Sequence, residues 1–281
     1  MSDHLETMPP TATEKKVAGS SFYTAMRIMP RAEREAMYAI YAFCRAVDDI
    51  ADDGQGTRAE RGIQLDTWRH DIETLYGGGP GGNADFLRPH VRRYGLRKAD
   101  FLAVIDGMEM DVIEDIRAPD LAMLDLYCDR VASAVGRLSI KVFGMDEVPG
   151  DRLAHHLGRA LQLTNIVRDL DEDAGIGRLY LPHELLHEAG ITDRDPLKVL
   201  SNPAVDQVAR GVARLAHEHY RQARLILRAR PRGQLRAPRL MGAVYGQILA
   251  KMEAQGWAPP RTRVSIGKGE LLLIVLRHGL M

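Results

Sequence analysis

One segment of this chain sets polar side chains at spacings that suit metal chemistry. Between residues 38 and 53 these side chains recur at helical intervals: Tyr41, Arg45, Asp48 and Asp52. At about 100° per residue, the four fall within a sector of roughly 60°, and apolar side chains cover most of the remaining circumference. We therefore expect a buried helix with a polar stripe facing a cavity. Because Asp48 and Asp52 stand four residues apart, their like charges repel and need a compensating cation.

A second segment, residues 161–173, repeats this pattern. Its polar stripe consists of Gln162, Asn165, Asp169 and Asp173. The same helical geometry places the four within roughly 40–80°, among aliphatic side chains. Carboxylate and amide oxygens are hard ligands that suit Mg²⁺, which usually completes its coordination shell with water and substrate phosphate. Two such helices facing each other predict a diphosphate site bridged by several Mg²⁺ ions.

Other interpretations of the aspartates compete with a metal site. A single pair of aspartates four residues apart is common on the solvent-exposed faces of helices. The alternative to a cavity is therefore a pair of exposed amphipathic helices. An EF-hand is excluded, because residues 169–173 lack the central glycine and the distal bidentate glutamate of that loop. Four acidic residues lie off both stripes and are interpreted as helix-end or supporting charges: Asp49, Asp53, Asp171 and Glu172.

The elements that must position the stripes are helices, since no sustained strand-like alternation occurs between turn residues. Periodicity and capping residues predict helices over 32–53, 57–76, 97–116, 120–143, 151–172, 204–229, 235–255 and 264–278. The glycine-rich stretch 77–83 lacks the strand and the Lys-Ser or Lys-Thr pair of a phosphate-binding loop, so it is interpreted as a flexible connection. We expect an all-α fold, with a mobile tail over 1–16 and a single helical domain over 17–281.

Charge and composition narrow the class of protein. The chain has 281 residues with 38 Lys plus Arg and 38 Asp plus Glu, so it lacks the basic excess typical of a nucleic-acid binder. Two cysteines, Cys44 and Cys128, are too few for a disulfide framework or a metal–thiolate site, and no signal peptide is visible, so reducing cytoplasm is the expected compartment. The apolar run 271–276 is too short to cross a bilayer, which takes about 20 residues. We expect this run to pack on the core, with insertion into a membrane surface as the alternative.

Several motifs together resemble the squalene and phytoene synthase family of head-to-head (1′–1) prenyl transferases. The two acidic segments carry the resemblance, together with residues 177–182 after the second of them. Further segments similar to the family are 20–23, 40–45, 127–136 and 245–249. Many members have glycine where this chain has Ser133. The likeness runs from residue 19 to about residue 277.

This resemblance implies an isoprenoid-synthase-like helical bundle around a central cavity, and Mg²⁺-dependent ionisation of an allylic diphosphate. The implied metal ligands are Asp48, Asp52, Asn165, Asp169 and Asp173. The implied substrate-binding residues are Ser21, Tyr41, Arg45, Gln162, Arg168, Arg178, Tyr245 and Lys268, with Arg263 as a further candidate. Three of them would take part in catalysis, through forked hydrogen bonds to the departing diphosphate and through tyrosine faces that stabilise a carbocation: Tyr41, Arg45 and Tyr245.

Three segments, 19–23, 131–136 and 268–279, are similar to the bacterial enzymes of the hopanoid pathway. The similarity implies that two farnesyl diphosphates are joined into presqualene diphosphate with Mg²⁺ and without NADPH. Alternatives within the family are condensation of two geranylgeranyl diphosphates to phytoene, or formation of squalene or dehydrosqualene. A non-catalytic helical scaffold is the alternative outside it, and the intact stripes argue against that. A membrane surface, at the inner face of the membrane, and downstream isoprenoid enzymes are further candidate partners, whereas no nucleic acid is expected.

Overall fold

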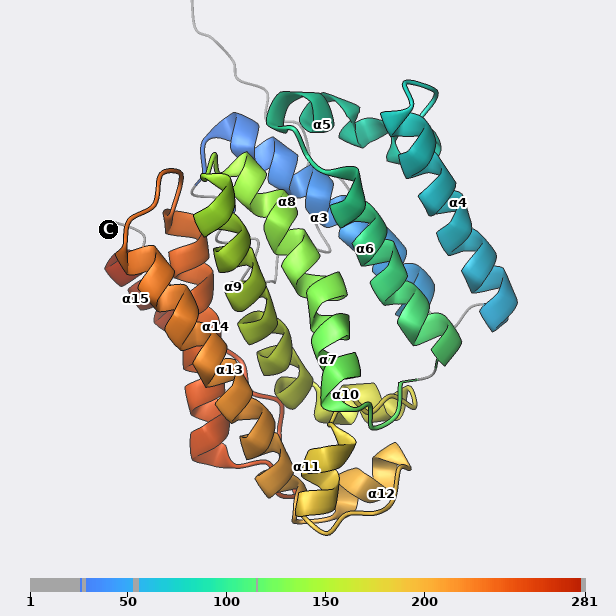
Figure 1. Ribbon diagram of the computed structural model, residues 1–281. Coiled ribbons are helices and arrows are strands. Elements are labelled where there is room, and N and C mark those ends of the chain that lie inside the picture. The colour runs from blue at the N-terminus through green and yellow to red at the C-terminus, as the bar shows by residue number, and fades with distance from the viewer. Residues whose placement is uncertain (1–25, 27–28, 53–55, 115, 279–281) are drawn as a thin grey trace, which may run out of the picture.

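The computed structural model describes residues 26, 29–52, 56–114 and 116–278. In this part of the chain every regular element is a helix, and the β-type pairing is confined to one isolated parallel bridge between Arg117 and Leu179. Figure 1 shows the long helices packed side by side, with short helices from residues 82–94 at one end of the bundle and short helices from residues 170–201 toward the other. The predicted all-α fold is confirmed.

The helices fall into a long set and a short set. The long helices are α3 (Arg31–Asp52), α4 (Arg58–Tyr76), α6 (Lys98–Glu109), α9 (Glu147–Arg168), α13 (Val205–Arg228), α14 (Arg236–Gln255) and α15 (Lys268–His278). The short elements are η1 (Gly82–Leu87), α5 (Arg88–Tyr94), η2 (Met110–Glu114), α7 (Leu121–Cys128), η3 (Asp129–Ser133), α8 (Ala134–Val142), α10 (Leu170–Gly175), α11 (His183–Glu188) and α12 (Pro196–Ser201). Each predicted helix has a counterpart. The sequence prediction misses η1, α5, α11 and α12, because one or two turns carry too little periodicity to detect.

Two of the predicted helices contain a turn of π-helix. The helix predicted over 120–143 consists of α7, the π-helical η3 and α8, and the helix predicted over 97–116 continues from α6 into the π-helical η2. Such turns are rare and concentrate at functional sites. Here η2 carries Asp111. η3 carries Val131 and Ala132, and these two residues line the cavity described below.

The second acidic segment does not lie on one unbroken helix, contrary to the prediction for 151–172. α9 ends at Arg168, Asp169 departs from helical dihedrals with φ −104° and ψ 22°, and α10 begins at Leu170. Helical hydrogen bonds nevertheless cross the joint: Asp169 N donates to Asn165 O, and Asp173 N donates to Asp169 O, each at 2.9 Å. The polar stripe therefore continues from Asn165 to Asp173 despite the break.

The core of the bundle forms around α9, which packs against α8 and α13 (Figure 1). α3 buries the face that carries Ile40, Phe43 and Val47, and the ring of Phe43 meets that of Phe101 on α6 edge-on, with 5.0 Å between centroids. Each fully buried aliphatic or aromatic side chain contributes about 1.5–3 kcal/mol relative to an exposed one. Burial of this face orients the polar stripe of α3.

The glycine-rich stretch joins α4 to η1 as the predicted connection, and hydrogen bonds anchor it. Asn83 N donates to Asp71 Oδ2 at 2.9 Å, and an Arg88 Nη2 donates to Gly79 O at 2.6 Å. Gly82 has φ +50°, and a Cβ on it would lie 2.1 Å from Asp71 Oδ1. Glycine is needed at position 82 both for this conformation and for the close approach of Asp71.

The C-terminal helix α15 packs on α14 through one of its faces. That face carries three partly buried side chains: Leu271, Ile274 and Val275. The prediction that this run packs on the core is confirmed for that face, while three leucines remain exposed: Leu272, Leu273 and Leu276. Among the described residues, no helix combines the length and the apolar character needed to span a membrane.

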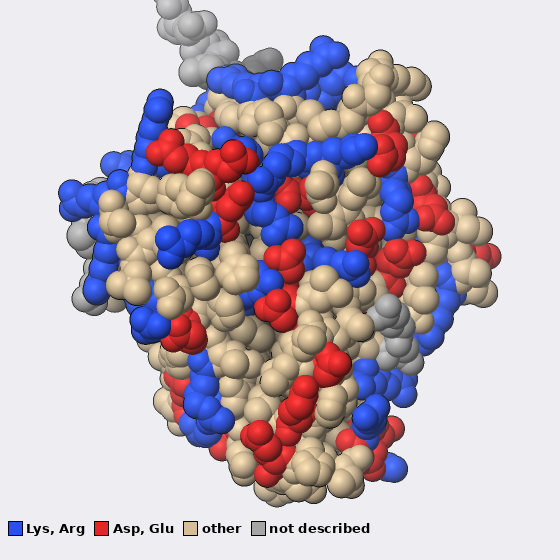
Figure 2. All heavy atoms as spheres, in the orientation of Figure 1, with Lys and Arg blue, Asp and Glu red and all other residues tan. Residues whose placement is uncertain are grey.

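The molecular surface carries charges of both signs. In Figure 2, Lys and Arg side chains lie among Asp and Glu over most of the face shown. Many surface charges are paired, as in Lys98 with Glu73 at 2.6 Å and Arg97 with Asp151 at 2.8 Å. Exposed pairs of this kind contribute only about 0–1 kcal/mol each. The surface pairs therefore add little to the stability that the buried core supplies.

Candidate active site

A cavity of about 480 Å³ lies among α3, α6, η3, α8, α9 and α14. Seven polar side chains of its lining gather at one end: Tyr41, Arg45, Asp48, Gln162, Asn165, Arg168 and Tyr245. Its apolar lining includes Met37, Ile40, Val104, Met108, Leu157 and Met241. On both α3 and α9 the polar residues follow the apolar ones along the helix, so the cavity has a polar end and an apolar body.

The polar end gathers most of the residues predicted from the sequence. All seven polar side chains of the lining just given are among them. The other predicted residues join the polar end through ion pairs and charge interactions: Asp52, Asp169, Asp173, Arg178 and Arg263. Ser21 and the side chain of Lys268 lie outside the described residues.

On α3, Arg45 lies between two aspartates. Its Nη1 donates to Asp48 Oδ2 at 2.6 Å, and its Nη2 pairs with Asp49, the residue interpreted from sequence as a supporting charge. Burial raises the pKa of Asp48 to about 7, and the neighbouring carboxylate of Asp52 adds to this rise against the opposing charge of Arg45. A buried carboxyl group beside a second carboxylate is a position where a bound cation is strongly favoured.

On α9 and α10, the carboxylate and amide oxygens are ligands suited to a hard metal ion. Asn165 Nδ2 donates to Gln162 Oε1 at 3.4 Å, whereas Asn165 Oδ1 is buried with no hydrogen-bond donor among the described residues. Burial raises the pKa of Asp173 to about 7, and the charge of Asp169 adds to the rise. A hard cation would satisfy both the unpaired oxygen and the destabilised carboxylate. The residues present therefore fit Mg²⁺.

Asp169 has a different environment from Asp48 and Asp173. Burial acts to raise its pKa, but ion pairs with Arg168 and Arg263 outweigh burial and hold the pKa below its ordinary value. Arg168 Nε lies 2.7 Å from Asp169 Oδ1, and Arg263 Nε lies 2.8 Å from the same oxygen. The Arg168 guanidinium also lies 5.9 Å from the ring centroid of Tyr245. Asp169 is thus a stable carboxylate held by two arginines.

Arg178 connects the two acidic segments. Its Nη1 donates to Asp52 Oδ1 at 2.5 Å, and its Nη2 donates to Ala51 O at 2.9 Å. Its Nε lies 4.0 Å from Asp111 Oδ1. Burial opposes the charge of Arg178, but the surrounding acidic and phenolic groups outweigh burial and raise its pKa, so it stays cationic. This residue, which follows α10, therefore closes the polar end against the end of α3.

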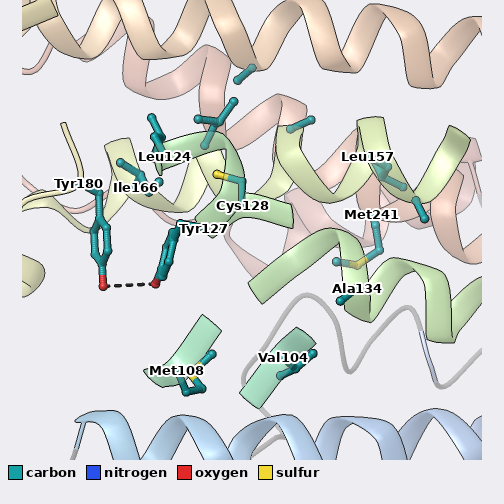
Figure 3. Close-up of a cluster of buried hydrophobic side chains, with 14 of the residues drawn as sticks. Val104, Met108, Leu124, Tyr127, Cys128, Ala134, Leu157, Ile166, Tyr180 and Met241 are labelled. Atoms are coloured by element: carbon teal, nitrogen blue, oxygen red, sulfur yellow. Dashed lines mark hydrogen bonds between the residues drawn. The ribbon is translucent and has the colours of Figure 1, made fainter. Parts of the chain in front are cut away.

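Three residues beside the polar end were not predicted as site residues, although two of them, Tyr127 and Tyr180, lie in segments that resemble the family. Asp111 accepts hydrogen bonds from Tyr180 Oη at 2.6 Å and from Tyr127 Oη at 3.0 Å. Figure 3 shows the two tyrosines side by side with their hydroxyls at the same end, joined by a hydrogen bond of 3.2 Å, and their rings stack with centroids 4.8 Å apart. Tyr127 also lines the cavity. Apolar neighbours on both sides, Met110 and Val112, are the sequence signal that could have identified Asp111.

The apolar body of the cavity is lined by side chains from several helices. Figure 3 shows Val104 and Met108 of α6 on one side, with Leu157 of α9 and Met241 of α14 across from them. Such a lining excludes water from whatever occupies it.

Ser133 stands where many family members have glycine. Its side chain contacts α9 and does not line the cavity. Its Oγ accepts from Arg159 Nη1 at 2.9 Å and donates to His155 O at 3.2 Å. A Cβ on Gly158 would lie 2.7 Å from the Ser133 Cα, so glycine at 158 permits this contact. The shape of the cavity therefore depends on the neighbours of Ser133 rather than on its side chain.

Comparison with known families agrees with this geometry. Residues 15–270 match the family described as squalene/phytoene synthase. The chain belongs to this family, which confirms the resemblance identified in the sequence.

The relatives with 50% identity or more that we compared are presqualene diphosphate synthases, whereas phytoene synthases are less similar. The presqualene diphosphate synthase of Zymomonas mobilis is 59% identical over 258 residues, which are 92% of this chain and 88% of that protein. The presqualene diphosphate synthase of Rhodopseudomonas palustris is 52% identical over 98% of both chains. Phytoene synthase 1 of Zea mays is 33% identical over 90% of this chain and 63% of that protein. The predicted branch is thus confirmed by full-length relatives.

Solved structures share the arrangement of helices. A dehydrosqualene synthase in complex with a ligand superposes with a TM-score of 0.78, at 22% identity, over 94% of this chain and 92% of that chain. Squalene synthase HpnC from Alicyclobacillus acidocaldarius superposes with a TM-score of 0.74, at 25% identity, over 89% of this chain and 98% of that chain. These likenesses confirm the fold.

Proposed function

We propose that this chain is a presqualene diphosphate synthase, which condenses two farnesyl diphosphates head to head and releases one diphosphate. The observation that carries the proposal is the identity of 50–59% to three presqualene diphosphate synthases over nearly the whole chain. The cavity supports it, because an apolar body beside an end lined with oxygen donors and arginines suits a prenyl tail joined to diphosphate.

The proposed magnesium ligands are the oxygens of Asp48, Asp52, Asn165, Asp169 and Asp173. Bound Mg²⁺ supplies Lewis-acid stabilisation of the negative charge that grows on the departing diphosphate. The raised pKa values of Asp48 and Asp173 support this assignment, since a nearby cation would favour the charged form of each carboxyl group.

The arginines of the site are placed to hold diphosphate. Each pairs with a proposed ligand: Arg45 with Asp48, Arg168 with Asp169, and Arg178 with Asp52. When those aspartates bind cations, the guanidinium groups can turn their donors to diphosphate oxygens. The same side chains thus balance charge in both arrangements, which keeps the free site from being a cluster of unopposed carboxylates.

The apolar body and the tyrosines would protect and steer the allylic cation. Tyr41 and Tyr245 line the cavity beside the arginines, where their π faces can stabilise positive charge. Burial raises the pKa of Tyr41, with the charge of Arg45 opposing the rise, so its hydroxyl stays protonated at neutral pH. The hydroxyl of Tyr41 is therefore suited to orient the reacting groups, and the released diphosphate is the stronger base for the proton lost as the cyclopropane closes.

Product analysis tests the proposal. Purified chain is incubated with farnesyl or geranylgeranyl diphosphate and Mg²⁺, with and without NADPH, and the products are identified by mass. We expect presqualene diphosphate from farnesyl diphosphate, unchanged by NADPH. Squalene in the NADPH reaction, or phytoene preferred from the longer substrate, would contradict the proposal. No release of diphosphate from either substrate would instead support a non-catalytic scaffold.

We also propose that the chain works in the cytoplasm and touches the membrane surface. The exposed leucines of α15 and the lipid character of substrate and product support this. Flotation with vesicles checks it: the chain should float with the lipid, and Leu272→Ser with Leu273→Ser should reduce the floated fraction. Equal flotation of both proteins would exclude α15 as the contact.

A further inference from the structure

Three histidines gather on the outer side of the α9–α13 contact, apart from the polar end of the cavity. His155 and His156 are neighbours on α9, and His219 comes from α13. One ring nitrogen from each lies within 4.8 Å of the others, and His156 Nδ1 is 3.0 Å from His219 Nδ1. Ring centroids are 4.7–5.8 Å apart. Three imidazoles converging from two helices form a possible ligand set for a metal ion.

The spacing of the nitrogens suits a tetrahedral metal. Two nitrogens that are each about 2.0–2.1 Å from one zinc ion lie about 3.3 Å apart in tetrahedral geometry. The observed 3.0 Å between His156 and His219 is close to that value, and the ring nitrogen of His155 lies within 4.8 Å of both. Withdrawal from water lowers the pKa of all three imidazoles, so they are neutral with lone pairs available at pH 7.5.

The surrounding charges do not exclude a cation. Arg159 lies near the cluster, but its Nε and Nη2 donate to Asp125 at 2.6 and 2.9 Å, and its Nη1 donates to Asp129 at 3.0 Å. The two carboxylates offset that positive charge. The charge of Glu218 on α13 acts to raise the pKa of His156, whereas the charge of Arg152 on α9 acts to lower it. The carboxylates therefore offset part of the positive charge that Arg152, Arg159 and Arg137 place near the cluster.

We propose that His155, His156 and His219 bind one first-row transition-metal ion, for which Zn²⁺ is the natural probe, with a fourth position left to water. Imidazole nitrogen suits Zn²⁺ and its neighbours in the series, whereas the carboxylate and amide oxygens of the cavity suit Mg²⁺. His156 and Asn165 are nine residues apart on α9, which places the two sites roughly 13 Å from each other along the helix. The chain thus holds two chemically distinct metal sites.

A bound ion would cross-link α9 to α13. α9 carries Gln162 and Asn165 of the cavity, and α13 is the helix against which α9 packs most extensively. An ion that binds only the folded arrangement raises the melting temperature by mass action. Its role is therefore to stiffen the helix that presents part of the polar end.

Zinc binding to the full-length chain tests the inference without any assay of catalysis. The chain is stripped with EDTA, dialysed into saturating Mg²⁺ to occupy oxygen ligands, and titrated with Zn²⁺ by calorimetry. We expect one Zn²⁺ per chain and a higher melting temperature. Co²⁺ in place of Zn²⁺ should show the intense visible absorption of a tetrahedral site.

Variants make the result specific to the three histidines. His219→Gln and His156→Gln should each weaken Zn²⁺ binding at least ~10-fold and abolish the Co²⁺ band, as loss of one of three ligands requires. His70→Gln, at an exposed histidine of α4, is the matched control and should bind as the parent does. Far-ultraviolet circular dichroism of the metal-free variants checks that they fold. Zn²⁺ binding that is absent in the parent, or equally strong in a folded His155→Gln, His156→Gln, His219→Gln triple variant, would overturn the inference.

Discussion

The acidic stripe of α3 and that of α9–α10 both set two aspartates four residues apart, yet the surroundings give the aspartates opposite properties. Burial and Asp52 raise the pKa of Asp48 to about 7, whereas Arg168 and Arg263 hold the pKa of Asp169 below its ordinary value. Asp173, which is on the same stripe as Asp169, resembles Asp48. Local spacing therefore sets which residues meet, and the cations that the fold brings near them set how readily each carboxyl group ionises.

The largest expected effect tests whether both stripes hold metal. Asp48→Asn and Asp169→Asn should each lower turnover at least ~10²-fold, because each removes a carboxylate ligand of a Lewis acid. The measurement is Mg²⁺-dependent release of diphosphate from farnesyl diphosphate, with circular dichroism to confirm folding. Asp66→Asn, on the exposed side of α4, is the control. Near-normal turnover in either stripe variant at moderate Mg²⁺ would show that only one stripe is catalytic.

A second prediction concerns the arginine of the α3 stripe. Arg45→Lys should lower kcat/KM at least ~10-fold with little change in melting temperature, because lysine lacks the planar fork that grips diphosphate. As a partly exposed pair, Arg45 with Asp48 contributes only about 0.3–0.5 kcal/mol to stability. Arg31→Lys, in an exposed pair on the same helix, should change neither quantity. A collapsed melting temperature with full activity in the folded fraction would identify Arg45 as structural.

A third prediction separates the two tyrosines that hold Asp111. Tyr127 lines the cavity, so Tyr127→Phe should lower kcat by about 10-fold, equivalent to about 1.4 kcal/mol of activation free energy. Tyr180→Phe should have a smaller effect on kcat but should lower the free energy of unfolding by about 1.5–3 kcal/mol, since it loses a hydrogen bond to a carboxyl group. Steady-state kinetics and urea unfolding measure the two effects. Equal losses of kcat would mean that both tyrosines act only by positioning Asp111.

A fourth prediction concerns the pH dependence of stability in EDTA. Because the folded pKa of Asp48 and of Asp173 is raised to about 7, the folded chain binds more protons than the unfolded chain between about pH 4 and pH 7. These two groups should therefore make stability fall as pH rises through this window. Asp169 contributes to the pH dependence with the opposite sign. Its lowered pKa stabilises the folded chain above about pH 4, and this stabilisation is lost as pH falls below that value.

Chemical denaturation from pH 3 to pH 8 measures this dependence. Asp48→Asn should flatten the fall between pH 4 and pH 7, and added Mg²⁺ should do the same, because a bound cation favours the charged carboxylates. An unchanged slope in Asp48→Asn would mean that Asp48 is already stabilised as a carboxylate in the folded chain.

Much of the site was predictable because it rests on local periodicity. Tyr41, Arg45 and Asp48 share a stripe for any helix of about 3.6 residues per turn, so their type and order predicted the polar end before any fold was known. The long helices follow from the same periodicity. The family resemblance added Arg168, Arg178 and Tyr245, which the structure does bring to the polar end.

Other features depend on contacts between residues far apart in the chain. Asp111 meets Tyr180 across 69 residues, and Arg178 meets Asp52 across 126, so neither pairing leaves a local pattern. The π-helical turns η2 and η3 and the change of backbone dihedrals at Asp169 also leave no signal in the helical periodicity of the sequence.

By itself, the sequence determined the long helices, the two acidic stripes and the family, since each depends on residue type and short-range spacing. Only the tertiary structure decided which carboxyl groups resist ionisation, which arginines neutralise them, and which histidines of α9 and α13 converge. The physical reason is distance: burial and Coulomb interactions act over a few ångströms of space, and the partners concerned are tens of residues apart along the chain.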